Sequence, residues 1–254
     1  MNRRNGLLAD GIPFETAARA VRESEGGRIL KRTASKAVLL VPGDPFLVVS
    51  RYERGVASRF GLGVDRARRA FRAAQAIRRL GVPAAHPLFA LRQGRRSWLG
   101  TSFVGPGRDL DAALRARADL GASLRELAES IARAHAAGWR LRDLRAENLL
   151  VDAEGRVRLV DFDGVSPSRA PARHARDLAR LSASFPPGGP VSNGLRLRFL
   201  VRYLRARRAL GRPVRRPRSF ARRAAARTQA LWNLWRRRGF DVGPQGVRLR
   251  PSVP

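Results

Sequence analysis

The sequence predicts an α+β fold, in which a small part rich in strands is followed by a larger part that is mainly helical. Two short apolar segments of strand-like composition, residues 29–41 and 46–52, come early in the chain. A Gly-Pro-Gly break at residues 105–107 separates them from a second part with long helical patterns and one hairpin pattern. Segregation of strands from helices along the chain is typical of an α+β arrangement.

The first part is predicted to contain three strands and one helix. Residues 29–41 and 46–52 are rich in Leu and Val, and the Pro-Gly-Asp-Pro turn between them predicts a hairpin. Over residues 65–80 the apolar side chains recur at helical spacing, and the Gly-Val-Pro that follows ends the helix. Residues 98–104 have the composition of a further strand.

The second part opens with two predicted helices. Asp109 or Asp111 is placed to cap a helix directly after the Gly-Pro-Gly break. A longer helix is expected over residues 123–137, where Ser123 and Glu126 have the spacing of a capping box. Both helices should therefore begin with a side chain that accepts hydrogen bonds from first-turn N–H groups.

The remainder of the chain combines one hairpin with arginine-rich helices. Residues 149–151 are apolar and residues 156–160 alternate, with Asp-Ala-Glu-Gly between them, which predicts a second hairpin. Beyond a loop rich in Pro and Gly at residues 186–190, the chain is expected to be helical. Its length fits one cooperative domain.

The charge of the chain is extreme. It carries 52 Lys and Arg against 20 Asp and Glu, a formal net charge of +32, which favours an anionic partner. All of these cations except Lys31 and Lys36 are arginines, and they lack the interleaved aromatic residues of a base-stacking surface. Solvated helix faces explain most of them, which disfavours nucleic acid as a partner. A nucleic-acid binder stays open as an alternative that rests on charge alone.

The composition also bears on compartment and metal content. No apolar run approaches the roughly 20 residues that a membrane-spanning helix needs, and no apolar stretch of signal-peptide length follows the first residues. We therefore expect a cytoplasmic protein, and the absence of cysteine agrees with that compartment. The spacing of the three histidines suggests no His/Cys metal cluster, and His135 is expected to be a packing or hydrogen-bonding residue.

Two acidic segments joined by the second predicted hairpin could carry chemistry. Residues 141–151 read L-R-D-L-R-A-E-N-L-L-V, and residues 160–164 read V-D-F-D-G. Phosphoryl transfer needs an oriented hydroxyl and neutralised phosphate charge, so one carboxylate near the acceptor and a carboxylate plus an amide on Mg²⁺ suffice. Asp143, Asn148 and Asp161 supply these groups. The alternative is that they are ordinary turn-forming residues.

These segments resemble the catalytic loop and metal-binding segment of protein-kinase-like enzymes, which read H-R-D-x-x-x-x-N and D-F-G. Asp143 precedes Asn148 by five residues and Asp161 by eighteen, as in that pattern, although Leu141 takes the place of the histidine. A helical segment ending in A-H-A-A-G precedes the loop. Residues 176–181 read R-D-L-A-R-L, similar to a D-L-x-R-L helix of the lipopolysaccharide kinases, which are the family that the chain resembles most.

The resemblance implies a bilobal protein-kinase-like fold, with a small β-rich N-lobe and a mainly helical C-lobe. The implied division is an N-terminal extension over residues 1–27, an N-lobe over 28–104 and a C-lobe with a basic helical end over 105–254. The hinge between the lobes would be the Gly-Pro-Gly break.

The resemblance also implies roles for individual residues. Asp143 would orient the acceptor hydroxyl and receive its proton, and Arg145 would meet the transferring phosphate. Asn148 and Asp161 would hold Mg²⁺, and the phosphate donor would be ATP.

The segment expected to bind the nucleotide departs from the family pattern. Residues 46–52 resemble the strand that carries the phosphate-binding lysine, and Ser50 takes the place of that lysine. Arg51 is adjacent, but side chains alternate across a strand, so Arg51 should point to the opposite face unless the register slips. Residues 66–80, which should supply the partner glutamate, contain no acid. Lys36 could reach the phosphates instead; its alternative is a solvated hairpin residue.

The implied function is that of an ATP-dependent phosphotransferase of the lipopolysaccharide core type, which transfers the γ-phosphate to a hydroxyl of a Kdo or heptose sugar. The acceptor would be an anionic glycolipid or another sugar, and the basic surface would suit peripheral association with the cytoplasmic membrane face. The altered nucleotide strand leaves an alternative of another class, a pseudokinase that acts as a scaffold or regulator.

Overall fold

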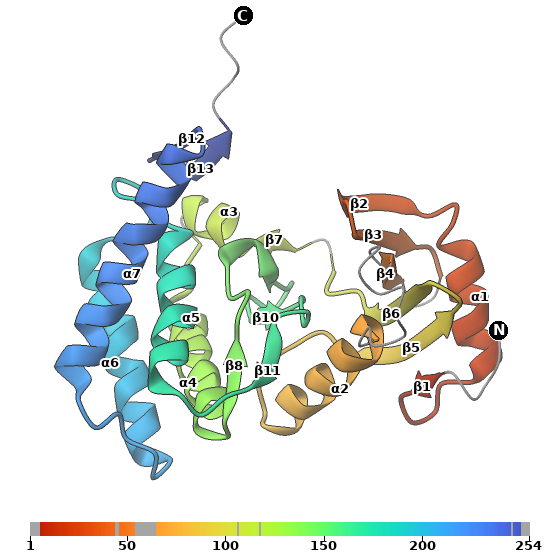
Figure 1. Ribbon diagram of the computed structural model, residues 1–254, viewed down its shortest axis with the longest axis horizontal. Helices are drawn as coiled ribbons and strands as arrows, with labels where there is room; N and C mark the ends of the chain where they lie inside the picture. Colours follow the sequence, from red (N-terminus) through yellow and green to blue (C-terminus); the bar gives the residue numbers. More distant parts are fainter. Residues whose placement is uncertain are drawn as a thin grey trace, which may run out of the picture. The chain divides into compact units, whose positions relative to one another are not determined.

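The computed structural model describes residues 6–43, 46–53, 65–105, 107–116, 118–244 and 246–249. The chain forms two compact units. Unit 1 comprises Met1–Arg79 and Ala84–Val104, and unit 2 comprises Leu80–Pro83 and Gly105–Pro254. Strands dominate unit 1 and helices dominate unit 2, which confirms the α+β fold (Figure 1).

Unit 1 is built on one antiparallel sheet. Its strands are ordered β1-β5-β6-β4-β3-β2. Their bounds are β1 Leu7–Leu8, β2 Arg28–Thr33, β3 Lys36–Val41, β4 Leu47–Glu53, β5 Pro87–Gln93 and β6 Arg96–Ser102. β4 lies between β3 and β6, so the strand that includes Ser50 and Arg51 is central. Residues 7–8, within the stretch expected to be an extension, pair with β5 at the edge of this sheet.

The expectation of a single strand over residues 29–41 is wrong, because a tight turn divides this segment into β2 and β3. The hydroxyl of Thr33 donates to the carbonyl of Lys36 at 3.2 Å and accepts from its backbone N–H at 3.1 Å. This exchange closes a two-residue turn that hydrophobic alternation alone does not reveal. The turn expected between β3 and β4 includes residues 44 and 45, which lie outside the described residues.

Two helices cover opposite faces of the sheet. α1 (Phe14–Glu23) buries Ala17 and Val21 against Val49 of β4. α2 (Arg66–Arg79) confirms the helix expected over residues 65–80. Its Arg66 guanidinium lies 4.8 Å from the centre of the Tyr52 ring. Because Val49 and Tyr52 are three residues apart on one strand, they point to opposite faces.

Unit 2 contains five α-helices among the described residues, together with short strands. The helices are α3 Leu110–Arg115, α4 Gly121–Ala136, α5 Pro171–Ala183, α6 Asn193–Ala209 and α7 Pro217–Arg237. The strands are β7 Arg108–Asp109, β8 Trp139–Leu141, β9 Leu149–Val151, β10 Val157–Leu159, β11 Val165–Pro167, β12 Phe240–Gly243 and β13 Gly246–Leu249. They form the sheets β10-β9-β7, β11-β8 and β12-β13. The predicted second hairpin is confirmed as β9 and β10.

The two predicted helix caps have different outcomes. Asp109 caps α3, since its carboxylate accepts from the backbone N–H of Ala112 at 2.8 Å, as expected. The capping box of α4 is wrong, because the helix begins at Gly121 and Ser123 lies inside its first turn. The Ser123 hydroxyl donates instead to the carbonyl of Gly155 at 2.6 Å. It therefore ties α4 to the turn of the β9–β10 hairpin.

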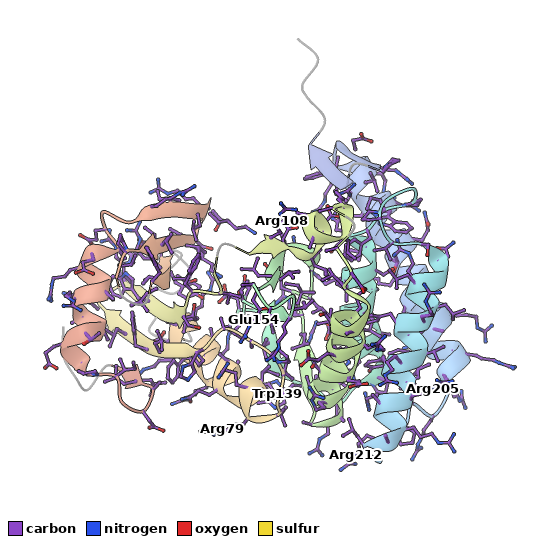
Figure 2. The ribbon with its side chains drawn as sticks, turned by 180° about the vertical axis from the view of Figure 1, so that it is seen from behind. Arg79, Arg108, Trp139, Glu154, Arg205 and Arg212 are labelled. Atoms are coloured by element: carbon purple, nitrogen blue, oxygen red, sulfur yellow. The ribbon has the colours of Figure 1, made fainter. Side chains whose placement is uncertain are left out.

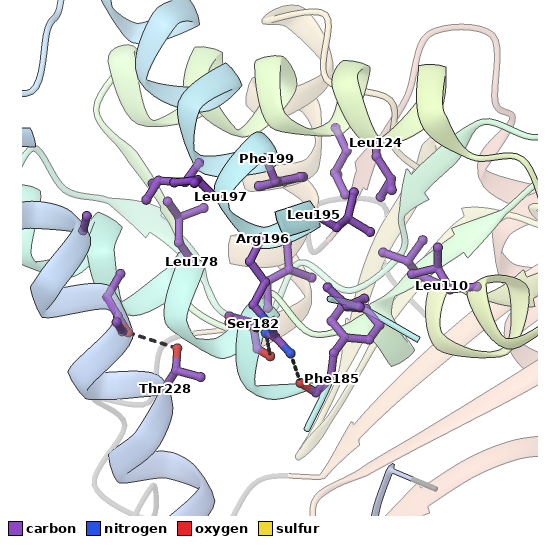
Figure 3. A pocket seen from close by; sticks show the side chains of 18 residues that line it. Leu110, Leu124, Leu178, Ser182, Phe185, Leu195, Arg196, Leu197, Phe199 and Thr228 are labelled. Atoms are coloured by element: carbon purple, nitrogen blue, oxygen red, sulfur yellow. Dashed lines mark hydrogen bonds between the residues drawn. The ribbon is translucent and has the colours of Figure 1, made fainter. Parts of the chain in front are cut away.

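An apolar cavity of about 200 Å³ lies among the helices of unit 2 (Figure 3). Leucine side chains from α3, α4, α5 and α6 line it, including Leu110, Leu124 and Leu178. Arg196 of α6 extends along its wall and donates to the carbonyl of Ser182 at 2.7 Å and to that of Phe185. These bonds tie α6 to carbonyls at and just beyond the C-terminal end of α5, where the intrahelical pattern of hydrogen bonds stops.

The arginines of the last two helices lie mainly on solvated faces. The guanidiniums of Arg205 on α6 and of Arg212, in the loop between α6 and α7, extend away from the body of unit 2 (Figure 2). Within the described part of the chain, no helix is both long enough and apolar enough to cross a membrane.

Candidate active site

The loop that contains Asp143 is held at both sides by the backbone. It follows β8, which pairs antiparallel with β11, so residue 141 lies opposite residue 165. The backbone N–H of Arg142 donates to the carbonyl of Gly164 at 3.1 Å. The backbone N–H of Leu141 donates to the buried carboxylate of Asp177 at 2.8 Å. The second acidic segment and helix α5 therefore both fix the start of this loop.

Asn148 joins the two acidic segments. Its side-chain nitrogen donates to the carbonyl of Asp143 at 2.9 Å, and its own carbonyl accepts from the backbone N–H of Val160 at 3.1 Å. Asn148 is nearly fully buried, which holds its carboxamide in one orientation. The carboxamide nitrogen is engaged in this contact, which leaves the oxygen as the atom suited to a cation.

The D-F-D-G segment packs directly against the Asp143 loop at Gly164. A Cβ added to Gly164 would lie 2.8 Å from the backbone nitrogen of Asp143, closer than real side chains approach. Within the segment, Asp161 is half-buried, and its carboxylate accepts from the backbone N–H of Asp163 at 3.1 Å. The structure thus links the Asp143 loop to residues 160–164 through the backbone bonds of Arg142 with Gly164 and of Val160 with Asn148.

These residues supply oxygen ligands of the kind that Mg²⁺ prefers. A carboxylate and a carboxamide oxygen fit a hard divalent cation, which usually keeps waters and phosphate oxygens as its other ligands. Within the described ranges, no group of three or more His, Cys, Asp or Glu side chains that could hold a metal ion is present.

Two arginines converge on one oxygen of Asp143. The Nε atom of Arg145 lies 3.0 Å from Oδ1 of Asp143, and its Nη1 lies 3.0 Å from the Glu147 carboxylate. The Nη1 atom of Arg180, from α5, lies 3.6 Å from the same Oδ1. The sequence indicated a position for Arg145 but no role for Arg180. Arg180 lies in the D-L-x-R-L segment, three residues after Asp177 and hence on the same helix face, which is the signal that could have identified it.

A buried network of aromatic and charged groups lies behind the loop. The rings of His135 and His174 stack with their centroids 4.1 Å apart. His135 Nδ1 lies 2.9 Å from the Tyr203 hydroxyl, and its Nε2 lies 3.5 Å from Asp177. Nη1 of Arg207 contacts both Tyr203, at 3.1 Å, and Nδ1 of His174, at 3.5 Å. His135 is therefore a hydrogen-bonding core residue, as expected.

This environment shifts the pKa values of its members. Burial lowers the pKa of His135. Burial, followed by the electrostatic interactions with His135 and Arg207, lowers the pKa of His174 to about 4. Burial raises the pKa of Tyr203 to about 12. Both imidazoles are consequently neutral at neutral pH.

The residues expected to bind the nucleotide lie in unit 1. No register shift occurs between β4 and its neighbours β3 and β6, so Ser50 and Arg51 point to opposite faces. Arg51 shares a face with Glu53, and the two side chains lie 3.6 Å apart. Lys36 pairs with Tyr52 across β3 and β4, and its Nζ lies 5.4 Å from the centre of that ring. Lys36 and Ser50 therefore share one face of the sheet.

Comparison with known proteins gives two findings. The sequence matches the family described as Lipopolysaccharide kinase (Kdo/WaaP) family over residues 49–198, more than half of the chain. Two curated relatives from Stenotrophomonas maltophilia, of strains R551-3 and K279a, are both named 3-deoxy-D-manno-octulosonic acid kinase. Each is 38% identical over 130 residues, which cover 48% of this chain and 51% of the relative. The alignment thus spans about half the length of these relatives.

Proposed function

Because the chain belongs to the lipopolysaccharide kinase (Kdo/WaaP) family, we propose that it is an ATP-dependent phosphotransferase that phosphorylates a sugar hydroxyl of the lipopolysaccharide core. One observation carries this proposal. The Asn148 side chain donates to the Asp143 carbonyl, and the backbone N–H groups of Arg142 and Val160 donate to the carbonyls of Gly164 and Asn148, so the Asp143 loop and residues 160–164 are linked in unit 2. Phosphoryl transfer needs one acceptor-side carboxylate and a carboxylate–carboxamide pair, and this link between the two segments supports assigning those roles to Asp143, Asn148 and Asp161.

In the proposed reaction, the carboxylate of Asp143 orients the acceptor hydroxyl and takes its proton. The hydroxyl oxygen forms a bond to the γ-phosphorus of ATP, the bond to the β–γ bridging oxygen breaks, and ADP leaves. Asn148 and Asp161 would hold Mg²⁺, which neutralises phosphate charge when it is bound. The contact of Arg145 with Asp143 at 3.0 Å supports a role in orienting that carboxylate and in meeting the transferred phosphate.

The proposed acceptor is 3-deoxy-D-manno-octulosonic acid, called the sugar acid below, within an anionic glycolipid. The name that both relatives share supports this choice. The exposed arginines of α6 and α7 would favour peripheral association with an anionic membrane surface, on the cytoplasmic side where ATP is available.

For the nucleotide, we propose that Lys36 supplies the positive charge that Ser50 lacks. The shared sheet face of these two residues supports this role, whereas Arg51 points to the other face. Lys36→Ala should then weaken Mg²⁺-ATP binding, measured by calorimetry. Arg51→Ala, the matched control, should leave binding unchanged.

The function is tested by steady-state phosphorylation of the sugar acid with Mg²⁺-ATP. Asp143→Asn and Asp161→Ala should each lower kcat/KM by about 10²–10⁴-fold, because each removes a group required by the transferring phosphoryl or its acceptor. Asp241→Asn, an exposed aspartate on β12, is the matched control and should retain the wild-type rate. If the wild type transfers no phosphate, whether or not it binds nucleotide, the result would instead favour a pseudokinase that acts as a scaffold. Ser50 and the absence of acidic residues from α2 support that function class.

A further inference from the structure

Helix α5 presents a polar stripe to the Asp143 loop. Asp177 accepts from the backbone N–H of Leu141 at 2.8 Å, and the hydroxyl of Ser184, just after the helix, accepts from that of Ala146 at 3.1 Å. These two contacts fix the loop at both ends. Arg180 lies between them on the same side of the helix, at the spacing i, i+3, i+7. Its guanidinium is directed at the middle of the loop.

The contact that Arg180 makes there is loose. Its Nη1 lies 3.6 Å from Oδ1 of Asp143, an oxygen to which Nε of Arg145 already lies at 3.0 Å. Across the ranges that the structure describes, this is the one polar contact of the Arg180 guanidinium, which carries five N–H donors. The side chain is 32% exposed, so a ligand can reach it. An arginine that served only to hold the loop would be expected to donate more hydrogen bonds to it.

The local charge favours an added anion. Arg142 and Arg145 repel Arg180, and Asp143 attracts it. Burial is the main cause that lowers the pKa of Arg180. The attraction to Asp143 raises this pKa, and the repulsion by Arg145 and Arg142 lowers it. The guanidinium nevertheless stays charged at all physiological pH values. A negatively charged group beside Arg180 would relieve the repulsion and pair with a partly desolvated cation.

We propose that Arg180 binds the carboxylate of the acceptor sugar, next to the hydroxyl that Asp143 orients, and so selects an acidic sugar; this inference rests on the proposed function. A hydroxyl within about 2.6–3.2 Å of the Asp143 carboxylate would lie within one sugar ring of Arg180. The planar guanidinium matches a carboxylate with two parallel hydrogen bonds, which a lysine cannot reproduce. Arg180 is thereby a specificity-determining residue.

The test compares the sugar acid with its methyl ester, which has the same hydroxyls and no charge. The full-length protein should phosphorylate the acid with a KM about 10- to 100-fold lower than that for the ester. Arg180→Gln should abolish this preference by raising KM for the acid alone, with little change in kcat. Arg180→Lys should restore part of it. Arg176→Gln, an exposed arginine on the same helix, should behave as wild type.

Two outcomes would overturn the role of Arg180. If Arg180→Gln lowers kcat equally for acid and ester, the residue merely positions the loop. If the preference for the acid survives in Arg180→Gln, another group binds the carboxylate, and a phosphate of the natural glycolipid becomes the candidate ligand of Arg180. In both cases transfer by the wild type leaves the proposed function intact.

Calorimetric binding of the acid and the ester, without nucleotide, separates the two proposals further. If the wild type binds the acid more tightly through Arg180 but transfers no phosphate, the acid site stands and the proposed function fails. If the protein neither distinguishes the two sugars nor transfers phosphate, both proposals are overturned.

Discussion

Acidification should destabilise the protein through the stacked histidines behind the Asp143 loop. His174 is nearly fully buried and has a pKa of about 4 in the folded state. In the unfolded chain its pKa returns to about 6.5. Above that value neither state is protonated, so His174 contributes no pH dependence. Between the two values the unfolded state binds more protons, and stability falls as the pH falls.

The size of the effect follows from this interval. One histidine contributes about 1.4 kcal/mol per pH unit while only the unfolded state is protonated. From about pH 8 to about pH 4.5, His174 should therefore reduce the free energy of unfolding by about 2.5 kcal/mol. Below about pH 4 the contribution levels off, because both states are then protonated. The lowered pKa of His135 acts in the same direction.

The assay is urea unfolding followed by tryptophan fluorescence at both pH values. Carboxylates also titrate in this range, so the comparison is with His174→Gln, which does not titrate and whose amide could still donate to the Ser168 carbonyl. That carbonyl lies 2.9 Å from Nε2 of His174. Between the two pH values the variant should lose about 2.5 kcal/mol less stability than wild type. Parallel pH profiles for the two proteins would refute the reasoning.

Three further predictions concern single residues of unit 2. Gly164→Ala should reduce the rate of phosphate transfer about tenfold or more, because the added Cβ would lie 2.8 Å from the backbone nitrogen of Asp143. Circular dichroism should show near-native secondary structure in this variant, and a wild-type rate of transfer would contradict the prediction. Asp177→Ala should lower the free energy of unfolding in urea by about 1–3 kcal/mol, since it leaves a backbone N–H of the loop without its acceptor, and Asp177→Asn should recover part of the loss. Arg196→Ala should cost about 1–2 kcal/mol in the same assay, because the Phe185 carbonyl loses its donor, whereas the exposed Arg198→Ala should stay within about 0.5 kcal/mol of wild type.

The features that the sequence predicts well are local ones. The β9–β10 hairpin and helix α2 depend on periodicity and turn residues within about 15 positions, and both are confirmed. The alternation of Ser50 and Arg51 follows from strand geometry alone, once the register is regular. The spacing of Asp143 and Asn148 similarly places both residues in one short loop, where the side chain of one contacts the backbone of the other.

The features that the sequence does not predict depend on contacts between distant residues. Ser123 has the spacing of a capping box, yet its hydroxyl bonds to Gly155, 32 residues later. Arg180 reaches Asp143 only because α5 returns to the loop after β11. The link from His135 to Tyr203 spans 68 residues. Periodicity carries no information about such contacts, because they depend on how helices pack against one another.

The most direct test of the proposed function is transfer of radiolabelled γ-phosphate from ATP to the sugar acid by the purified full-length protein. We expect Mg²⁺-dependent labelling of the sugar by the wild type and none above background by Asp161→Ala, because Asp161 lies in the segment that is hydrogen-bonded to Asn148 and Arg142 of the Asp143 loop. Equal labelling by both proteins would contradict the role assigned to Asp161. Labelling by neither, while both remain folded, would contradict the assignment of a kinase.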